Sequence, residues 1–291
     1  MTGAAPAYTP RRSVLYMPSS NERALHKAKS LPVDGLILDL EDAVGPGDKE
    51  TARTAACAAV TSGEYGHREL TIRVNGLGTE WHDADVEAAC HAGPDGIVVP
   101  KVNTAEEVKV LEEALERFGA PERTRLWAMI ETPEAIFNAP EIAAASERLT
   151  VFVMGTNDLV KELQAHHVPG RGPLITALSW ALLAARRSGV AVLDGVYNDV
   201  KDAQGFEAEC IQGRDMGFDG KTLIHPGQVE PCNEIFAPDN DAVAEARGII
   251  EAFEAGGGTG VVTYNGKMIE NLHVDIARRV LATHEAIASR S

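Results

Sequence analysis

Two carboxylate residues, Glu131 and Asp158, each lie in a polar turn that follows a short apolar run. The runs, Leu126–Ile130 and Leu149–Met154, have the length and composition of buried parallel strands. Because neighbouring parallel strands end at the same edge, we expect the two carboxylates to lie close together. Carboxylate oxygens, together with water and a substrate oxygen, are the ligands that Mg²⁺ prefers, so the pair is a candidate metal site. The alternative is that both residues are helix-capping or loop acids, and their spacing alone does not decide between the two.

The other expected strands also end in polar residues that a structural core would not require. These residues are Asp39, Glu41, Asp42, Arg73, Asn75, Lys101, Asp194 and His225. In an α/β barrel they would ring the same mouth, where barrel enzymes carry their catalytic groups. Arg73 and Lys101 could meet the charge of a substrate carboxylate or enolate.

We expect the remaining charged residues of this ring to contact the metal ligands and hold them in position. We assign this role to Asp39, Glu41, Asp42, Lys101 and Asp194. Asp39 and Asp42 could instead be purely structural partners of Lys101 or Arg73, although we favour the supporting role.

The elements that must position these side chains alternate regularly along the chain. Each of eight strand-like runs is followed by a helical pattern, and we see no break typical of a doubly wound sheet. The runs are Ser13–Met17, Gly35–Leu40, Leu70–Val74, Gly96–Pro100, Leu126–Ile130, Leu149–Met154, Val190–Leu193 and Lys221–Ile224. This order predicts an α/β fold, a closed (β/α)8 TIM barrel. The 291 residues suit one barrel of about 250 residues with an appendage.

The end of the chain has the pattern of a separate small unit. A glycine run, Gly256–Gly260, precedes an Asn-Gly dipeptide between β-prone flanks, which is a strong hairpin signal, and a last helix is expected over Leu272–Ile287. We therefore expect residues 1–12 to be a disordered tail and residues 13–255 to form the barrel domain with a trailing helix. Residues 256–291 would be a glycine hinge and a C-terminal hairpin–helix lid. A C-terminal helix packed on its own barrel fits the same pattern.

The composition limits the binding partners that we expect for this protein and the cellular compartment in which we expect it. The chain has 27 Lys and Arg residues against 43 Asp and Glu residues, and this net charge of −16 disfavours nucleic acid and anionic membranes. The four cysteines show no C-x-x-C pairing and the start of the chain has no apolar signal segment, so we expect reduced thiols and a cytoplasmic protein. The sequence has no run of membrane-spanning length and no G-x-S-x-G, Walker A or G-x-G-x-x-G motif.

Several motifs, taken in order, resemble one known family. They are RSVLYMPSSN (Arg12–Asn21), LDLEDAV (Leu38–Val44), IRVN (Ile72–Asn75), IETPEAI (Ile130–Ile136), MGTNDL (Met154–Leu159), LDGVYNDV (Leu193–Val200), GFDGKTLIHPGQV (Gly217–Val229) and TYNGKMIE (Thr263–Glu270). Together they resemble the citrate lyase β-subunit / malyl-CoA lyase family of Mg²⁺-dependent acyl-CoA lyases, most of all its stand-alone citramalyl-CoA and malyl-CoA lyases. The resemblance implies a barrel that closes around acyl-CoA. It also implies a homo-oligomer, a trimer or a hexamer, in which the lid reaches a neighbouring subunit.

The resemblance also implies roles for residues of the catalytic mouth. Glu131 and Asp158 would bind Mg²⁺, with Glu131 also against the substrate, and Arg73 would bind the oxo-acid or thioester oxygen. The catalytic acid/base of the family is an aspartate in the lid sequence K-M-I-D, and Glu270 stands at that position here. Glutamate keeps the carboxylate but adds a methylene, and a misplacement of about 1 Å can cost on the order of 10²-fold in rate.

A second set of residues falls where the family contacts CoA: Tyr16, Arg23 and Lys27. Arg23 and Lys27 are four residues apart on the first expected helix and therefore share a face. They could form the basic patch that an acidic protein needs for the CoA phosphates. As an isolated pair they would be solvated surface residues.

We therefore predict a reversible, Mg²⁺-dependent carbon–carbon lyase. It would cleave a 3-hydroxyacyl-CoA, such as malyl-CoA or citramalyl-CoA, to acetyl-CoA and an α-keto acid. Arg73 would stabilise the thioester enolate and Glu270 would exchange a proton with it. The alternatives are a thioesterase acting on the same malyl-CoA, a citrate lyase β subunit acting on an acyl-carrier protein, and a non-catalytic acyl-CoA-binding protein.

Overall fold

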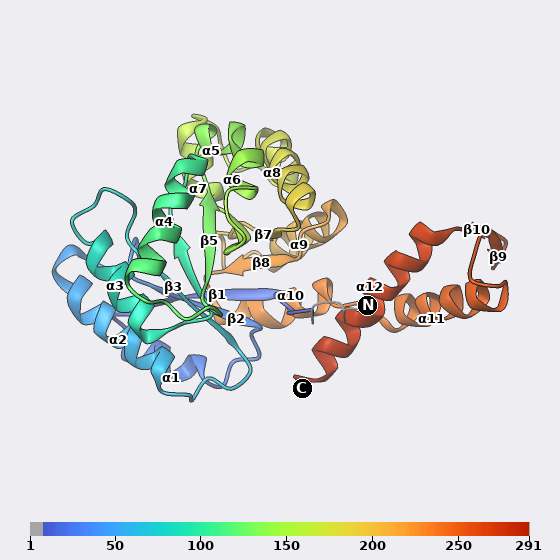
Figure 1. Cartoon of the computed structure of the whole chain (residues 1–291), viewed down its shortest axis with the longest axis horizontal. Helices are drawn as coiled ribbons and strands as arrows, with labels where there is room; N and C mark the ends of the chain where they lie inside the picture. Colours follow the sequence, from blue (N-terminus) through green and yellow to red (C-terminus); the bar gives the residue numbers. More distant parts are fainter. Residues whose placement is uncertain (1–7, 291) are drawn as a thin grey trace. The chain divides into compact units, whose positions relative to one another are not determined.

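A computed structural model describes residues 8–290, and its larger compact unit, Arg11–Asn233, is a closed barrel (Figure 1). Each strand pairs in parallel with the next one along the chain, and β8 pairs with β1. The strands are β1 (Ser13–Pro18), β2 (Gly35–Asp39), β3 (Glu69–Arg73), β4 (Gly96–Val99), β5 (Arg125–Ile130), β6 (Leu149–Met154), β7 (Ala191–Asp194) and β8 (Gly220–Leu223). The predicted (β/α)8 barrel is therefore confirmed.

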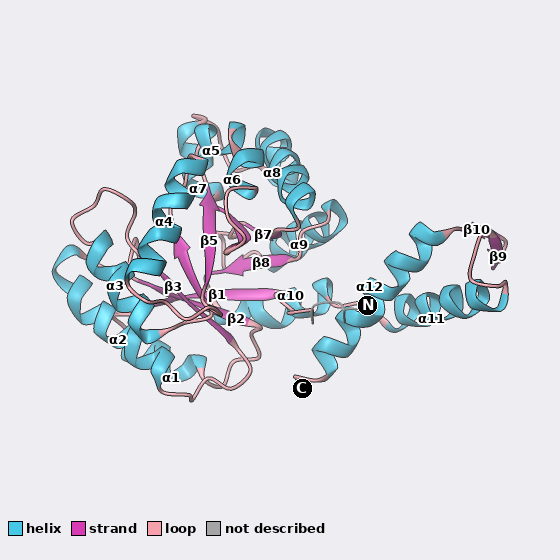
Figure 2. Cartoon of the chain, in the orientation of Figure 1, coloured by secondary structure: helices cyan, strands magenta, loops and turns pink. Residues whose placement is uncertain are grey.

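Helices alternate with these strands and surround the barrel (Figure 2). They are α1 (Glu22–Ala28), α2 (Lys49–Thr61), α3 (His82–Ala92), α4 (Ala105–Arg117), α5 (Pro133–Phe137), α6 (Ala139–Ala143), α7 (Thr156–Glu162), α8 (Ile175–Ser188), α9 (Ala203–Met216) and α10 (Val229–Phe236), with short 3₁₀ turns η1 (Pro46–Asp48), η2 (Pro169–Leu174) and η3 (Pro226–Gln228). The helical pattern after β5 breaks into α5 and α6 because Pro140 has no N–H and its ring would clash with the carbonyl of Ile136 in a continuous helix. Within residues 8–290, every helix is too short or too polar to span a lipid bilayer.

The interior of the barrel is filled by apolar side chains from alternate strand positions. They are Val14, Ile37, Val98, Trp127, Met129, Val151, Val153 and Leu193. Trp127 is fully buried, and it requires glycine at position 96, because a Cβ there would lie 2.8 Å from its Nε1. Above these layers, polar residues at the carboxyl ends of the strands line a cavity.

The first described residues of the barrel unit are anchored to it. The Nε of Arg11 lies 2.6 Å from a carboxylate oxygen of Glu69, and its guanidinium carbon is 5.3 Å from the ring centroid of Trp127. Arg12 pairs with Asp34 at 2.8 Å. The predicted tail of residues 1–12 is therefore wrong for residues 11 and 12, because two ion pairs hold them, while residues 1–7 lie outside the described part.

Of the described residues, 234–290 form a second compact unit together with residues 8–10. It contains α11 (Asn240–Ala255), the antiparallel hairpin β9 (Val262–Tyr264) and β10 (Lys267–Ile269), and α12 (Asn271–Ala288). Asn265 and Gly266 have φ angles of 47° and 74°, as a type I′ hairpin turn requires, so the predicted hairpin is confirmed.

The predicted boundary at residue 255 differs from this division. Phe253 of α11 packs with Ile269 and Val274 in one small core, so α11 belongs with the hairpin and α12 rather than with the barrel. The glycine run therefore lies inside the C-terminal unit. It ends α11 and turns the chain back onto that helix, with the backbone N–H of Gly258 donating to the carbonyl of Phe253.

Candidate active site

The carboxyl ends of the strands enclose a cavity of about 330 Å³. Its polar lining includes most of the residues expected at the mouth: Tyr16, Asp39, Asp42, Arg73, Glu131 and Asp158. Met129, Met154 and Ile224 supply apolar walls. Glu41 and Lys101 line an adjoining cavity of about 570 Å³ and reach the same charged groups through ion pairs. We call the first cavity with its lining residues, Glu41 and Lys101 the catalytic pocket.

Glu131 follows β5 directly and is only 2% exposed. Burial raises the pKa of its carboxyl group to about 7, although the charge of Lys101 opposes this effect. One carboxylate oxygen accepts the backbone N–H of Lys101 at 2.8 Å. The other lies against Gly155, where a Cβ would come within 2.1 Å of it. The turn after β6 therefore needs glycine so that this carboxylate can enter the pocket.

Lys101 brings a positive charge close to the acids of the pocket. Its Nζ lies 3.4 Å from Asp158 and 3.8 Å from Glu41. Burial lowers the pKa of Lys101, but the carboxylates of Glu131, Glu41 and Asp158 outweigh it and the net pKa is raised. The backbone of Lys101 has a φ of 52°, a conformation that non-glycine residues seldom adopt and that is enriched at functional sites.

Arg73 is held by partners within the pocket. Its Nε and Nη2 each lie 2.6 Å from an oxygen of Asp39, and its Nη1 lies 2.7 Å from Glu41. The pairing follows from the register, because Arg73 and Asp39 are neighbours at the ends of β3 and β2. Pairing of Asp39 with Arg73, which from the sequence was only an alternative to the supporting role, is therefore what the structure shows. The Nε–Nη2 edge of the guanidinium is thereby occupied by Asp39, and Nη1 faces Glu41.

Tyr16 lies in the pocket floor, where its ring is 4.8 Å from the guanidinium carbon of Arg73. Burial raises the pKa of Tyr16, so its hydroxyl stays protonated at neutral pH. Arg23 and Lys27 lie together on the exposed surface of α1, as the spacing predicts. Their contact with CoA stays a prediction.

The donor set of the pocket fits a divalent cation of the Mg²⁺ type. Within the described residues, five acids, Asp39, Glu41, Asp42, Glu131 and Asp158, face the two cations Arg73 and Lys101, so the carboxylates outnumber the cations by three. All the available ligand atoms are hard oxygens. Within the described residues no cluster of three or more acids, cysteines or histidines forms a complete cage. Mg²⁺ binds through one or two carboxylates with water and substrate completing its shell, so Glu131 and Asp158 are sufficient.

Asp194 requires a correction, because the structure does not bring it to the pocket. Its carboxylate is fully buried and lies 2.6 Å from Nη1 of Arg171 and 3.1 Å from Nζ of Lys221. Lys221 in turn reaches Glu209 of α9, so this cluster faces the outer helices. The neighbouring Leu193 faces the interior, and alternation along the strand turns Asp194 outward.

Other residues of the sequence prediction lie elsewhere or were missed. Glu270 lies in the C-terminal unit, where its backbone N–H donates to Nδ1 of His273 at the start of α12. The prediction missed Lys49, which is 6% exposed and donates to the carbonyls of Leu40 and Glu41 and to Asn75. A lysine at the start of a helix gives no sequence signal for such a role. It supports the loop that carries Glu41.

A closed barrel with buried acids and an arginine at the carboxyl ends of its strands is the arrangement typical of barrel enzymes, which carry their catalytic groups at this end. The comparisons with known proteins agree. Residues 12–226 match the model of the family described as HpcH/HpaI aldolase/citrate lyase, and the chain belongs to that family.

Relatives match over nearly the whole chain. A (3S)-malyl-CoA thioesterase of Cereibacter sphaeroides is 48% identical over 282 residues, which cover 96% of each protein. The citrate lyase subunit beta of Escherichia coli is 38% identical over 282 residues, 94% of this chain and 93% of that protein. The structure of CitE from Mycobacterium tuberculosis, in complex with magnesium, acetoacetate and coenzyme A, superposes with a TM-score of 0.77 at 27% identity, over 94% of this chain and 97% of that one.

Proposed function

We propose that this protein is a Mg²⁺-dependent enzyme that acts on a 3-hydroxyacyl-CoA of the malyl-CoA type, and that it hydrolyses the thioester to the free hydroxy acid and CoA. The observation that carries the substrate class is the pocket itself, in which buried oxygen ligands lie beside Arg73. The choice of hydrolysis is supported by the 48% identity to a (3S)-malyl-CoA thioesterase.

Glu131 and Asp158 would hold the cation, which when bound supplies a Lewis acid and a template for the oxygens of the hydroxy acid. Nη1 of Arg73, now paired with Glu41, would exchange that partner for an oxygen of the substrate and stabilise the negative charge that develops there. Asp39 keeps the guanidinium plane fixed during this exchange. A carboxylate must accept the proton of the attacking water, and Glu270 is our candidate for that base.

The carbon–carbon lyase reaction is the second candidate, favoured by the 38% identity to a citrate lyase subunit. The same Arg73 would then stabilise an enolate, and Glu270 would deliver a proton to its carbon. The two reactions differ in the bond that breaks, so their products separate them.

The test is incubation of the purified protein with (3S)-malyl-CoA and Mg²⁺ in isotopically labelled water, with product analysis by mass spectrometry. Hydrolysis gives malate with one labelled carboxylate oxygen and free CoA. Cleavage of the carbon–carbon bond gives acetyl-CoA and glyoxylate without that label. Glu131→Gln is the control that should give neither. Acetyl-CoA as the dominant initial product would overturn the proposal of hydrolysis. If wild type turns over no substrate, both reactions are rejected and the remaining alternative is a non-catalytic acyl-CoA-binding protein.

We also propose a cytoplasmic homo-oligomer, a trimer or a hexamer, in which Glu270 of one subunit serves the pocket of another. Subunits carrying Glu131→Gln have a damaged pocket but an intact lid. Subunits carrying Glu270→Gln have an intact pocket but a damaged lid. Unfolding and refolding the two inactive variants together should restore part of the activity if the site is shared. Mixtures that stay inactive, while wild type refolds with full activity, would contradict a shared site.

A further inference from the structure

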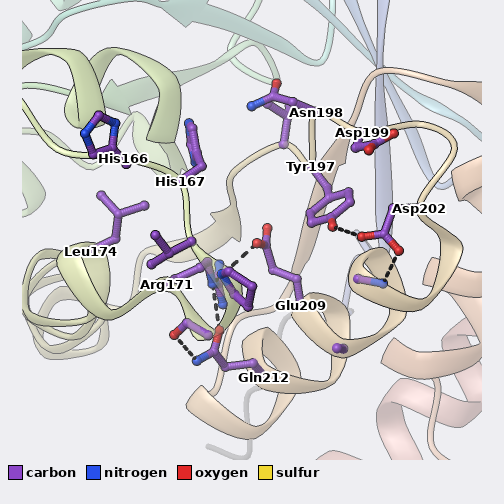
Figure 3. Close-up of a pocket in the computed structure, with 16 residues that line it drawn as sticks. His166, His167, Arg171, Leu174, Tyr197, Asn198, Asp199, Asp202, Glu209 and Gln212 are labelled. Carbon is purple, nitrogen blue, oxygen red and sulfur yellow. Dashed lines mark hydrogen bonds and ion pairs between the residues drawn. The ribbon is translucent and has the colours of Figure 1, made fainter.

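The chain segment after β7, Gly195–Asn198, separates two cavities. Val196 lines the catalytic pocket on one side and a cavity of about 520 Å³ on the other, which is the cavity drawn in Figure 3. A wall with open space on both sides is not held by close packing at that point. Its position therefore depends on specific bonds, which lie at its ends and at Tyr197, whose carbonyl accepts a hydrogen bond from Nε2 of Gln228 at 3.0 Å.

The first of these bonds is made by Asp194, the buried residue that the catalytic pocket does not use. Its carboxylate accepts a hydrogen bond from the backbone N–H of Gly195 at 2.8 Å. Nη1 of Arg171 donates to both oxygens of the same carboxylate, at 2.6 and 2.7 Å. Arg171 is fixed in turn by Gln212 at 2.7 Å, as the dashed lines in Figure 3 show, and Lys221 completes the charge balance. The start of the segment is thus tied to a rigid buried ion cluster.

The segment makes two contacts with the first turn of α7, which carries Asp158. Gly195 lies so close to Thr156 that a Cβ would come within 2.4 Å of its Oγ1. Asn198 and Asn157 exchange reciprocal side-chain hydrogen bonds of 2.7 and 3.1 Å. Both contacted residues lie within two positions of Asp158.

We propose that Asp194, Gly195 and Asn198 form a positioning clamp that fixes the first turn of α7 and thereby holds the Asp158 carboxylate in place for a divalent cation. This inference rests on the proposed function, because it takes Asp158 as a metal ligand. The clamp joins the motifs LDGVYNDV and MGTNDL, which lie far apart in the sequence, and Thr156 and Asn157 of the second motif also line the catalytic pocket. None of the three residues is catalytic, since each acts on Asp158 through its neighbours.

The test measures metal binding by the full-length protein without substrate. Mn²⁺ is the probe, because it takes the same oxygen ligands as Mg²⁺ and its unbound fraction is read directly by electron paramagnetic resonance. Outer partners of metal ligands commonly contribute about 10–100-fold to metal affinity. We expect Asn198→Ala and Gly195→Ala each to weaken Mn²⁺ binding by about tenfold. Asp199→Ala is the matched control, since the side chain of Asp199 bonds only within its own turn, to the backbone N–H of Lys201, and should bind Mn²⁺ like wild type.

Two further variants separate a clamp from general damage. If the amide pair acts as one unit, Asn157→Ala combined with Asn198→Ala should lose no more affinity than either alone. Asp194→Asn, which keeps the shape of the side chain, should raise the Mg²⁺ concentration for half-maximal activity more than it lowers kcat at saturating Mg²⁺. Variants of Asn198 and Gly195 that bind Mn²⁺ as tightly as wild type would overturn the clamp alone. Wild type that binds no Mn²⁺ would overturn the metal assignment of the proposed function, and the clamp with it.

Discussion

Replacement of Glu131 by glutamine should abolish activity and yet stabilise the metal-free barrel. Burial raises the pKa of Glu131 from its ordinary value of 4.5 to about 7. A group whose pKa is higher in the folded state contributes stability below its unfolded pKa and loses it as the pH rises through the folded pKa. Each unit of that difference is worth about 1.4 kcal/mol, so above about pH 7 the ionised carboxylate costs the folded barrel roughly 3 kcal/mol. Glutamine has the same shape and does not ionise, so it avoids this cost.

Urea unfolding followed by tryptophan fluorescence measures this difference. Trp81, Trp127 and Trp180 all lie in the barrel unit, so the signal reports that unit and not the C-terminal one. At about pH 8 without metal, Glu131→Gln should unfold with a free energy higher than that of wild type by a large part of roughly 3 kcal/mol. The gap should shrink at about pH 5. Glu134→Gln, an exposed acid in the following turn, is the control and should match wild type at both values.

Addition of Mg²⁺ should reverse the order of stability. The cation binds the ionised carboxylate of the folded protein, so wild type gains stability with rising Mg²⁺ and the glutamine variant does not. Equal stability of the two proteins at both pH values would refute the burial cost. An equal Mg²⁺ effect on both would show that the cation does not bind Glu131.

Four other variants test the remaining assignments through steady-state kinetics with malyl-CoA. Arg73→Lys keeps the charge but loses the two-point pairing with Asp39, so we expect kcat/KM to fall by at least about 100-fold; a value within about twofold of wild type would contradict the role. Arg23→Ala with Lys27→Ala should raise KM for the CoA thioester about tenfold and leave KM for a short thioester without phosphates unchanged, whereas equal effects on both would exclude phosphate contact. Glu270→Gln should lower kcat by about 10²-fold or more. Glu270→Asp should shift the products toward acetyl-CoA if the side-chain length selects the reaction, and an unchanged product ratio would argue that it does not.

The barrel and most of its mouth could be predicted because they follow from periodicity. Alternating strands and helices fix where each strand ends, and that placed Arg73, Glu131 and Asp158 in one pocket. The sequence could not decide which side chains at the strand ends form ion pairs with one another. Asp39 pairs with Nε and Nη2 of Arg73 because the register of β2 and β3 places the two residues side by side. No local sequence pattern reveals that register.

The errors also have physical causes. Parallel strands are buried on both faces, so the apolar run before Asp194 carries no alternation that would say which way the aspartate points. The boundary at residue 255 was misplaced because the apolar face of α11 predicts a partner but not which one. Only the packing of Phe253 against Ile269 and Val274 assigns that helix to the C-terminal unit.

The cluster around Asp194 and the catalytic pocket both combine acids with Arg and Lys residues. They differ in the number of acids for each cation. Around Asp194, two acids face two cations: Asp194 and Glu209 against Arg171 and Lys221. This cluster is neutral, and a neutral buried cluster needs no ligand to be stable. In the catalytic pocket five acids face two cations, and burial already raises the pKa of Glu131 to about 7. Such a site stays unfavourable until it takes up protons or a divalent cation. Charge balance therefore supports the proposed positioning role of the first cluster and the proposed catalytic role of the second.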